Sequence, residues 1–430
     1  KFLVDCGMFQ GSKYASEENL ADFKFDPKEI DFLILTHAHA DHCGRLPKLC
    51  KDGFGGKIYS TAATRDLAEI ILLDSAKIIA EEAREHGIQA LFEISDVYDA
   101  MTRFWPANYE EIVRITPEIE IRFRDAGHIL GSASIECFIV EDGRQKKIVF
   151  SGDLGNPPAP IVRDPEVIDG ADLVVIESTY GGKVHEPADT RVQKLRQVIV
   201  ESIGQGGNLL IPVFALERSQ EIIYELNYLH ETRQIPKVPI FMDGPLAIEA
   251  IEIYRKYINL FDDESRERIN SGDDIFNFDG LTYTRTVEQS KEINNVPSPK
   301  VILAGSGMIN GGRMIHHLKR NISDANNHLL FISYQANGTM GRRLLDGANK
   351  IYINNEEFAV HAKISAIGAY SSHADQKKLI HWLSNIKKPI PNKILLDHGE
   401  QERLLGLQDG INKELKINSE IVRYGKCYEV

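Results

Sequence analysis

A dense group of potential metal ligands lies near the start of the chain. The segment Thr36-His-Ala-His-Ala-Asp-His42 contains three imidazoles, those of His37, His39 and His42, and the carboxylate of Asp41. Imidazole and carboxylate ligands together suit Zn²⁺ and similar borderline divalent metals. A surface loop that is merely rich in histidine is the alternative, but few structural roles need this pattern. The segment therefore predicts a metal site.

Two metal ions would need more ligands than these four, and suitable residues follow later apolar runs. Each of them lies just beyond a predicted strand and beside a glycine, where the backbone can turn sharply. Taken singly, each residue would be an ordinary loop residue, but the shared placement favours one common site. The residues are His128 after Ile119–Phe123, Asp153 after Lys147–Phe150, and His398 after Lys393–Leu396.

Short β-branched and apolar runs alternate with helical patterns along the chain, which predicts a layered α/β architecture. Helix ends are indicated by polar caps or glycine-rich entries. The predicted strands are 32–35, 148–150, 173–176, 209–213, 300–304, 329–332 and 393–396. The predicted helices are 62–85, 190–202, 217–229, 246–257, 312–319, 376–385 and 401–415.

Composition excludes several classes of protein. With 430 residues, 43% hydrophobic and 26% charged, the chain is long enough for two or three folded domains and is neither disordered nor fibrous. The net charge of −13 argues against a broad basic surface that wraps duplex nucleic acid, but bound metals can reverse the local potential of an enzyme site. Five cysteines without a CxxC pair, and no apolar run long enough to span a membrane, favour a reduced cytoplasmic protein.

The motifs together resemble those of the metallo-β-lactamase fold and its β-CASP branch of nucleic-acid-processing hydrolases. The chain looks most similar to bacterial and archaeal ribonucleases related to the endonuclease subunit of the cleavage and polyadenylation specificity factor. The metallo-β-lactamase motifs are represented by Asp5, the segment His37 to His42, His128 and Asp153. The additional β-CASP motifs are represented by Glu177, by His373 in Ser371-Ser-His-Ala-Asp375, and by His398 in Asp-His-Gly-Glu400.

This resemblance implies a specific α/β architecture. Residues 1–180 and 352–430 would form the two parts of a metallo-β-lactamase αββα sandwich. A Rossmann-like β-CASP domain would be inserted between them over residues 181–351. Because the chain opens with Lys1-Phe-Leu-Val-Asp-Cys-Gly7, which reads as the middle of a strand, we also expect a segment that precedes Lys1.

The resemblance also implies a role for each motif residue. Two Zn²⁺ ions are the expected cofactors, with Mn²⁺ or Fe as alternatives. One ion would be held by His37, His39 and His128, the second by Asp41, His42 and His398, with Asp153 bridging both. Asp5 would orient a ligand imidazole through its other ring nitrogen. Glu177 and His373 would form an acid pair in which His373 protonates the leaving oxygen. The predicted catalytic residues are thus Asp41, Asp153, Glu177 and His373.

The activity implied by the resemblance is hydrolysis of phosphodiester bonds in RNA, by an endonuclease or a 5′–3′ exonuclease. His398 favours RNA because DNA-directed family members generally lack this histidine. Hydroxyl and guanidinium groups would contact the RNA phosphates. These candidates are Ser371, Ser372, Arg313, Arg342 and Arg343. For Arg342 and Arg343, a solvated charged surface is an equal alternative. Because family members often pair, a homodimer is one expected state, and no membrane partner is expected.

Two other functions stay open from the sequence. A small-molecule hydrolase of the same fold, acting on a thioester or lactone, would not need the inserted segment 181–351 to cover its substrate. A non-catalytic scaffold subunit of an RNA-processing complex would be expected to lack metal ligands, all of which are present here. Metal stoichiometry would separate the scaffold from the enzymes, and a substrate panel would separate the two enzymes.

Overall fold

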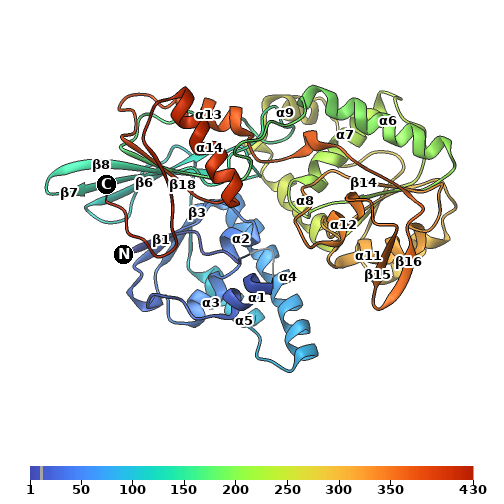
Figure 1. The fold of residues 1–430 in the computed structure, drawn as a ribbon, viewed down its shortest axis with the longest axis horizontal. Helices are drawn as coiled ribbons and strands as arrows, with labels where there is room; N and C mark the ends of the chain where they lie inside the picture. Colours follow the sequence, from blue (N-terminus) through green and yellow to red (C-terminus); the bar gives the residue numbers. More distant parts are fainter. Residues whose placement is uncertain (10–12, 430) are drawn as a thin grey trace. The chain divides into compact units, whose positions relative to one another are not determined.

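The chain divides into two compact units in a computed structural model that describes residues 1–9 and 13–429. Unit 1 comprises Lys1–Val184 and Ser372–Val430, and unit 2 comprises His185–Ser371 (Figure 1). Unit 1 is therefore built from two segments far apart in the sequence, and unit 2 is an insertion between them.

Unit 1 contains two β-sheets. The first is an all-parallel sheet with the order β1-β2-β3-β4. The second has the order β19-β18-β9-β8-β7-β6-β5, antiparallel from β5 to β8 and parallel from β8 to β19. The strands of the first sheet are β1 (Phe2–Val4), β2 (Phe32–Ile34), β3 (Lys57–Thr61) and β4 (Phe104–Ala107). Those of the second are β5 (Val113–Arg114), β6 (Ile119–Asp125), β7 (Ala133–Glu141), β8 (Arg144–Phe150), β9 (Leu173–Ile176), β18 (Lys393–Leu396) and β19 (Ser419–Ile421).

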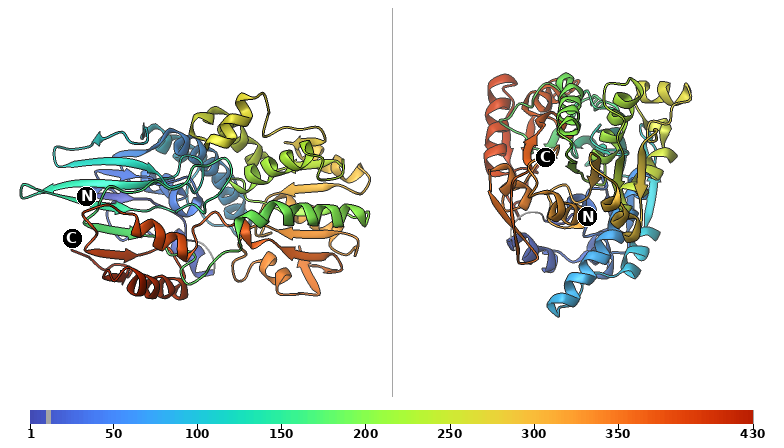
Figure 2. Two further views of the ribbon diagram at one scale, coloured as in Figure 1. Left: turned by 90° about the horizontal axis from the view of Figure 1, so that it is seen from above. Right: turned by 90° about the vertical axis from the view of Figure 1, so that its right-hand side faces the viewer.

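The two sheets share one buried core and carry helices outside it. Ile34 and Tyr59 of the first sheet pack with Phe123 and Ile135 of the second. The outer face of the second sheet is covered by α13 and α14, drawn in red in Figure 2, through residues such as Trp382. Helix α4 packs on β3 and β4 of the first sheet. The helices are α1 (Lys13–Leu20), α2 (Ala40–Cys43), α3 (Leu46–Lys51), α4 (Ala62–His86), α5 (Ile94–Thr102), α13 (Gln376–Ser384) and α14 (Gln401–Glu414). Unit 1 is thus an αββα sandwich, which confirms the predicted fold class.

Unit 2 is a Rossmann-like doubly wound domain. Its six-stranded sheet has the order β12-β11-β13-β10-β14-β17, and every neighbouring pair is parallel. Connections between parallel strands are right-handed, so connections that run in opposite directions along the sheet place helices on both of its faces. The strands are β10 (Leu209–Pro212), β11 (Ile240–Asp243), β12 (Leu281–Thr284), β13 (Val301–Ala304), β14 (His328–Phe331) and β17 (Lys363–Ala366), with a separate hairpin of β15 (Lys350–Ile353) and β16 (Glu356–Ala359). The helices are α6 (Arg191–Gly204), α7 (Arg218–Glu231), α8 (Pro245–Lys256), α9 (Asp263–Asn270), α10 (Val287–Glu292), α11 (Gly312–Asn321) and α12 (Met340–Leu345).

The units divide at positions that differ from the boundaries expected from the sequence. The first division lies between residues 184 and 185 rather than 180 and 181, and the second lies between 371 and 372 rather than 351 and 352. The second difference has a clear cause: β17 pairs in register with β14, from His328↔Lys363 to Phe331↔Ala366, and so adds an edge strand to the inserted sheet. Ile351 and Ile353 of β15 also belong to the core of unit 2.

No helix in the part of the chain that the structure describes is long and apolar enough to cross a bilayer. The five cysteines have free thiols, of which only that of Cys427 belongs to an exposed residue.

The ion network on the second sheet of unit 1 generates a stability prediction. The fully buried carboxylate of Glu136 on β7 lies 2.5 Å from Arg122 Nε and 3.0 Å from Arg124 Nε, and it also pairs with Lys147. We expect Glu136→Ala to lower the free energy of unfolding by about 3 kcal/mol, because three cationic side chains lose their shared counter-charge. Urea denaturation measures this, with the exposed Glu141→Ala on the same strand as control. Equal losses for the two variants would contradict the assignment.

A buried acid in unit 2 generates a pH prediction. Glu217, which precedes α7 with φ 64°, is 2% exposed and accepts a hydrogen bond of 2.8 Å from Tyr254 Oη. Burial raises the pKa of Glu217 to about 7. The neutral carboxyl therefore stabilises the fold fully below pH 4.5, the usual pKa of a glutamate side chain. This contribution to the free energy of unfolding is lost as the pH rises from 4.5 to about 7.

We expect Glu217→Gln to remove this loss. Relative to the wild type, the variant should gain on the order of 3 kcal/mol of unfolding free energy between acidic pH and pH 8. Urea denaturation of both proteins across this range measures the difference, with the exposed Glu267→Gln as control. A difference that does not change with pH would show that the pKa of Glu217 is the same in the folded and unfolded states.

Candidate metal centre

The predicted ligands of unit 1 gather where strands end. β2 leads into the segment from His37 to His42, whose second half, from Ala40, forms the start of α2. β8 leads to Asp153 and β18 leads to His398. β8, β9 and β18 are parallel neighbours, so their carboxyl ends lie at the same edge of the second sheet. His128 lies in the loop between β6 and β7. Residues separated by more than 350 positions therefore meet at one place.

A first group consists of three imidazoles and the carboxylate of Asp153, with ligand atoms within 4.8 Å of one another. His39 Nδ1 lies 3.1 Å from both His37 Nε2 and His128 Nε2. Asp153 Oδ2 lies 3.4 Å from His37 Nε2 and 3.6 Å from His128 Nε2. Burial lowers the pKa of His37 and His128 well below the usual value and that of His39 to about 4. These imidazoles are therefore neutral and have lone pairs for a cation.

A second group comprises Asp41, His42 and His398. His42 Nε2 lies 3.2 Å from His398 Nε2, which is 3.6 Å from Asp41 Oδ2. Asp153 reaches this group as well, because its Oδ2 is 3.4 Å from His42 Nε2 and its Oδ1 is 3.4 Å from His398 Nδ1. The surrounding imidazoles, those of His398 and His42 first, outweigh burial and hold the pKa of Asp153 well below its usual value. One ionised carboxylate thus faces both groups.

The donor set fits divalent cations. Asp153 Oδ1 is buried and accepts no hydrogen bond from any described residue. A cation bound at this oxygen would stabilise it. The charge of Asp153 raises the pKa of His398 to about 9, and the carboxylates of Asp153 and Asp5 overcome burial to raise that of His42. A metal ion meets the same demand, because binding replaces a ring proton.

Asp5 supports the second group from behind. Its Oδ2 lies 2.7 Å from His42 Nδ1, so His42 directs Nε2 towards Asp153. Asp5 is itself held by Thr36, whose backbone N–H and hydroxyl both donate to the carboxylate at 2.8 Å. The turn after Asp5 requires Gly7, since a Cβ there would lie 1.5 Å from the carbonyl oxygen of Asp41. Asp5 thus lies beside the imidazole of His42, and the role of this imidazole as a metal ligand stays a prediction.

Three further contacts hold imidazole rings of the two groups in place, and the sequence analysis did not predict them. His37 Nδ1 lies 3.0 Å from Thr36 Oγ1, and His398 Nδ1 lies 3.2 Å from Thr179 Oγ1. His128 Nδ1 lies 3.3 Å from the carbonyl oxygen of Ser372 and so acts as the donor there. In the sequence, Thr36 could be found from its hydroxyl, which directly precedes the His37 to His42 segment. Thr179 could be found from its place in the segment Glu177-Ser-Thr179. A backbone carbonyl gives no signal in residue type.

Glu177 and His373 form a pair next to Asp153. Glu177 Oε2 lies 3.3 Å from His373 Nδ1, which is 3.8 Å from Asp153 Oδ2. Glu177 is fixed by the backbone N–H of Leu154, which donates to its Oε1 at 2.6 Å. Burial lowers the pKa of His373, but the Glu177 carboxylate outweighs burial and leaves the pKa raised. Glu177 therefore favours the protonated form of an imidazole that lies beside the two ligand groups.

The side chains proposed to contact RNA lie in both units. Ser372 belongs to unit 1, whereas the other four belong to unit 2. The Arg313 guanidinium pairs with buried Asp243 and donates to the carbonyl oxygens of Thr284 at 2.9 Å and Arg285 at 2.6 Å. Arg342 Nε donates to both carboxylate oxygens of Asp346 at 3.0 Å, and Arg343 is exposed. Arg313 thus has a structural role in unit 2, and the RNA contacts stay predictions.

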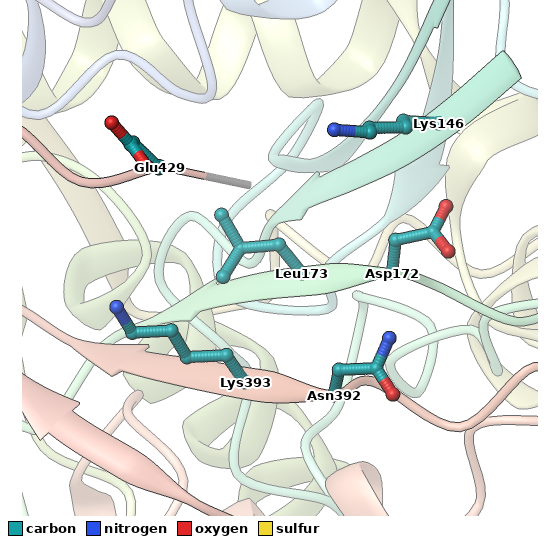
Figure 3. Close-up of a pocket in the computed structure, with 6 residues that line it drawn as sticks. All are labelled: Lys146, Asp172, Leu173, Asn392, Lys393 and Glu429. Atoms are coloured by element: carbon teal, nitrogen blue, oxygen red, sulfur yellow. The ribbon is translucent and has the colours of Figure 1, made fainter. Parts of the chain in front are cut away.

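A cavity of about 260 Å³ lies in unit 1, and none of the predicted site residues lines it (Figure 3). It lies where β9 and β18 begin, at Leu173 and Lys393, whereas Glu177 and His398 follow the other ends of these strands. Its lining residues are Lys146, Asp172, Leu173, Asn392, Lys393 and Glu429. This cavity is separate from the metal-ligand cluster.

Known families match most of the chain. Residues 1–205 match the metallo-β-lactamase superfamily, and residues 219–344 match the β-CASP domain. Residues 357–422 match a family described as a Zn-dependent metallo-hydrolase RNA specificity domain.

Several relatives are similar over nearly the whole chain. Ribonuclease TTHA0252 of Thermus thermophilus is 40% identical over 95% of this chain and 89% of its own length. An RNase J-like protein of Methanocaldococcus jannaschii is 34% identical over 97% of this chain and 91% of its own length. The transcription termination factor FttA of Methanosarcina mazei is 33% identical over 97% of this chain, which spans only 66% of that protein. These matches, together with the αββα sandwich and the inserted doubly wound domain, show that the chain belongs to the β-CASP family of metallo-β-lactamase-superfamily hydrolases.

Proposed function

We propose that this chain is a two-metal ribonuclease that hydrolyses phosphodiester bonds within RNA, in RNA processing or decay. The observation that carries the proposal is the position of Asp153, which has ring nitrogens of both ligand groups 3.4 Å from its carboxylate oxygens. The choice of RNA is supported by the similarity to a protein named ribonuclease and by the RNA specificity family that matches residues 357–422. A 5′–3′ exonuclease activity is the second mode of the same site.

In this proposal the two ligand groups each hold one Zn²⁺ ion. His37, His39 and His128 would hold the first, Asp41, His42 and His398 the second, and Asp153 would contact both. When bound, the pair of ions supplies hydroxide near neutral pH and neutralises charge that develops on the phosphate oxygens. Mn²⁺ or Fe would suit the same donor types.

The residues of the chain have distinct tasks in the reaction. Asp5 and Thr36 fix His42 and His37, and Thr179 and the Ser372 carbonyl fix His398 and His128, so the ligand rings need little reorganisation. His373, kept protonated by Glu177, donates its proton to the oxygen that leaves the phosphorus. Glu177 then stabilises the positive charge when the imidazole is protonated again.

Cleavage of one RNA labelled separately at each end, and of its DNA counterpart, tests the proposed activity. The metal-loaded protein should cut RNA at internal positions and leave the DNA intact, and a chelator should abolish cutting. Shortening only from the 5′ end would indicate the exonuclease mode. Failure to cut either polymer with two metal ions bound per chain would favour a small-molecule hydrolase.

Asp153→Asn should disrupt both ligand groups at once. An amide carries no charge, so we expect metal content to fall below two ions per chain and RNA cleavage to fall by about 10³-fold or more. Elemental analysis and the cleavage assay measure the two effects. Asp142→Asn, on the exposed turn between β7 and β8, is the matched control. Near-normal values for both quantities in Asp153→Asn would exclude the bridging role.

His373→Ala should separate proton donation from metal binding. Because general acid catalysis typically contributes 10²–10⁴-fold, we expect RNA cleavage to fall by about that factor while metal content is unchanged. A phosphodiester with a 4-nitrophenolate leaving group needs little protonation and should be hydrolysed almost as fast by the variant as by the wild type. If both substrates slowed equally, His373 would not be the proton donor.

A further inference from the structure

We propose that Tyr180 stacks on the base of the nucleotide that carries the leaving oxygen, and so selects RNA that is unpaired at the cleaved bond. The inference rests on the proposed function and adds a substrate contact to the same site. Tyr180 belongs to the loop that follows β9 and lies three residues after Glu177. Its neighbour Thr179 places a hydroxyl oxygen 3.2 Å from His398 Nδ1.

Solvent reaches the two ligand groups from one side. Asp153, which faces both groups, is only 2% exposed, but three side chains around it are more open. Those of His398, Asp41 and His373 are 35%, 29% and 20% exposed. A phosphodiester must therefore approach past these three side chains. Half-buried Tyr180 lies on this side, because its ring centroid is 6.1 Å from that of His373.

A nucleotide that takes a proton from His373 must also lie close to Tyr180. Its leaving oxygen has to come within hydrogen-bond distance of the imidazole, which is about 3 Å. The ribose that carries this oxygen also carries the base, so both come within reach of a ring 6.1 Å from His373. The two rings are inclined at 44° to each other, so the imidazole does not cover the face of Tyr180 as a parallel stack would.

Stacking on a tyrosine ring suits an unpaired base of any type. Every base has a π face, so the contact does not read sequence. A base within a duplex is paired and stacked on its neighbours, whereas a base in a single strand can turn onto a protein ring. With a net charge of −13, the chain has little general attraction for phosphates, and a stacking contact does not depend on charge.

Kinetics of RNA cleavage by the metal-loaded protein test this contact. Tyr180→Ala should raise the KM for a single-stranded RNA by about 5- to 100-fold and leave kcat nearly unchanged, because stacking is equally strong before and during the reaction. Tyr180→Phe and Tyr180→Trp keep an aromatic face and should keep the wild-type KM, whereas Tyr180→Leu should resemble Tyr180→Ala. Tyr98→Ala, which removes an exposed tyrosine of α5, is the matched control.

RNAs that lack a single base separate stacking from mere support of the His373 ring. In a series of RNAs, each abasic at one nucleotide near the mapped cleavage site, one member should show the same rise in KM with the wild type. Tyr180→Ala should cleave this RNA and the intact RNA with equal KM. If Tyr180 only held the His373 ring, Tyr180→Ala would instead have a lower kcat and an altered pH profile of kcat, with equal losses on every RNA.

Three results would overturn the inference and leave the proposed function intact. They are a wild-type KM for Tyr180→Ala, a rise in KM that is the same for intact and abasic RNAs, and equal cleavage of one bond in duplex and single-stranded RNA. A wild type that hydrolyses a 4-nitrophenyl phosphodiester but cuts no RNA would overturn the proposed function, and the inference with it.

Discussion

The structure of unit 1 depends on one buried carboxylate. Asp153 is 2% exposed, and an ionised group in such a place is costly unless positive charge surrounds it. The fold meets this demand with the rings of His42 and His398, whose pKa values are raised and whose nitrogens lie 3.4 Å from Asp153 oxygens. The neutral rings of His37 and His128 lie within 3.6 Å of the same carboxylate. The same arrangement suits cations, because it concentrates neutral and anionic donors around one point. Structural need and chemical function thus have the same origin.

The two sheets of the sandwich contribute to the site in different ways. The parallel strands β8, β9 and β18 bring their carboxyl ends to one edge, and so place Asp153, Glu177 and His398 together. The other sheet contributes the segment after β2 and also Asp5, which follows β1. Hydroxyl and carbonyl groups behind the rings then set which nitrogen faces inward. Rigid strands thus supply position, and the hydrogen bonds behind them supply orientation.

Much of this arrangement could be predicted from local patterns. All seven predicted strands and all seven predicted helices have counterparts, from β2 for 32–35 to α14 for 401–415, because apolar periodicity and caps determine them locally. The boundary expected between residues 351 and 352 lies before the observed one between 371 and 372, because β17 pairs with β14 and belongs to unit 2. Pairing between distant strands leaves little signal in the local sequence. One signal was present there: Asn354 and Asn355, with φ of 50° and 64°, form the turn of the β15–β16 hairpin. The ligand types were visible in the sequence, and the hydroxyls of Thr36 and Thr179 lie beside the predicted motifs. The Ser372 carbonyl could be identified only from its three-dimensional contact with His128.

Anomalous X-ray diffraction at the zinc absorption edge, from crystals of the metal-loaded protein, tests the central claim most directly. Our account predicts two anomalous peaks per chain. One should lie among His37, His39 and His128, the other among Asp41, His42 and His398, and both should contact the Asp153 carboxylate. A single peak, or two peaks of which only one contacts Asp153, would contradict it.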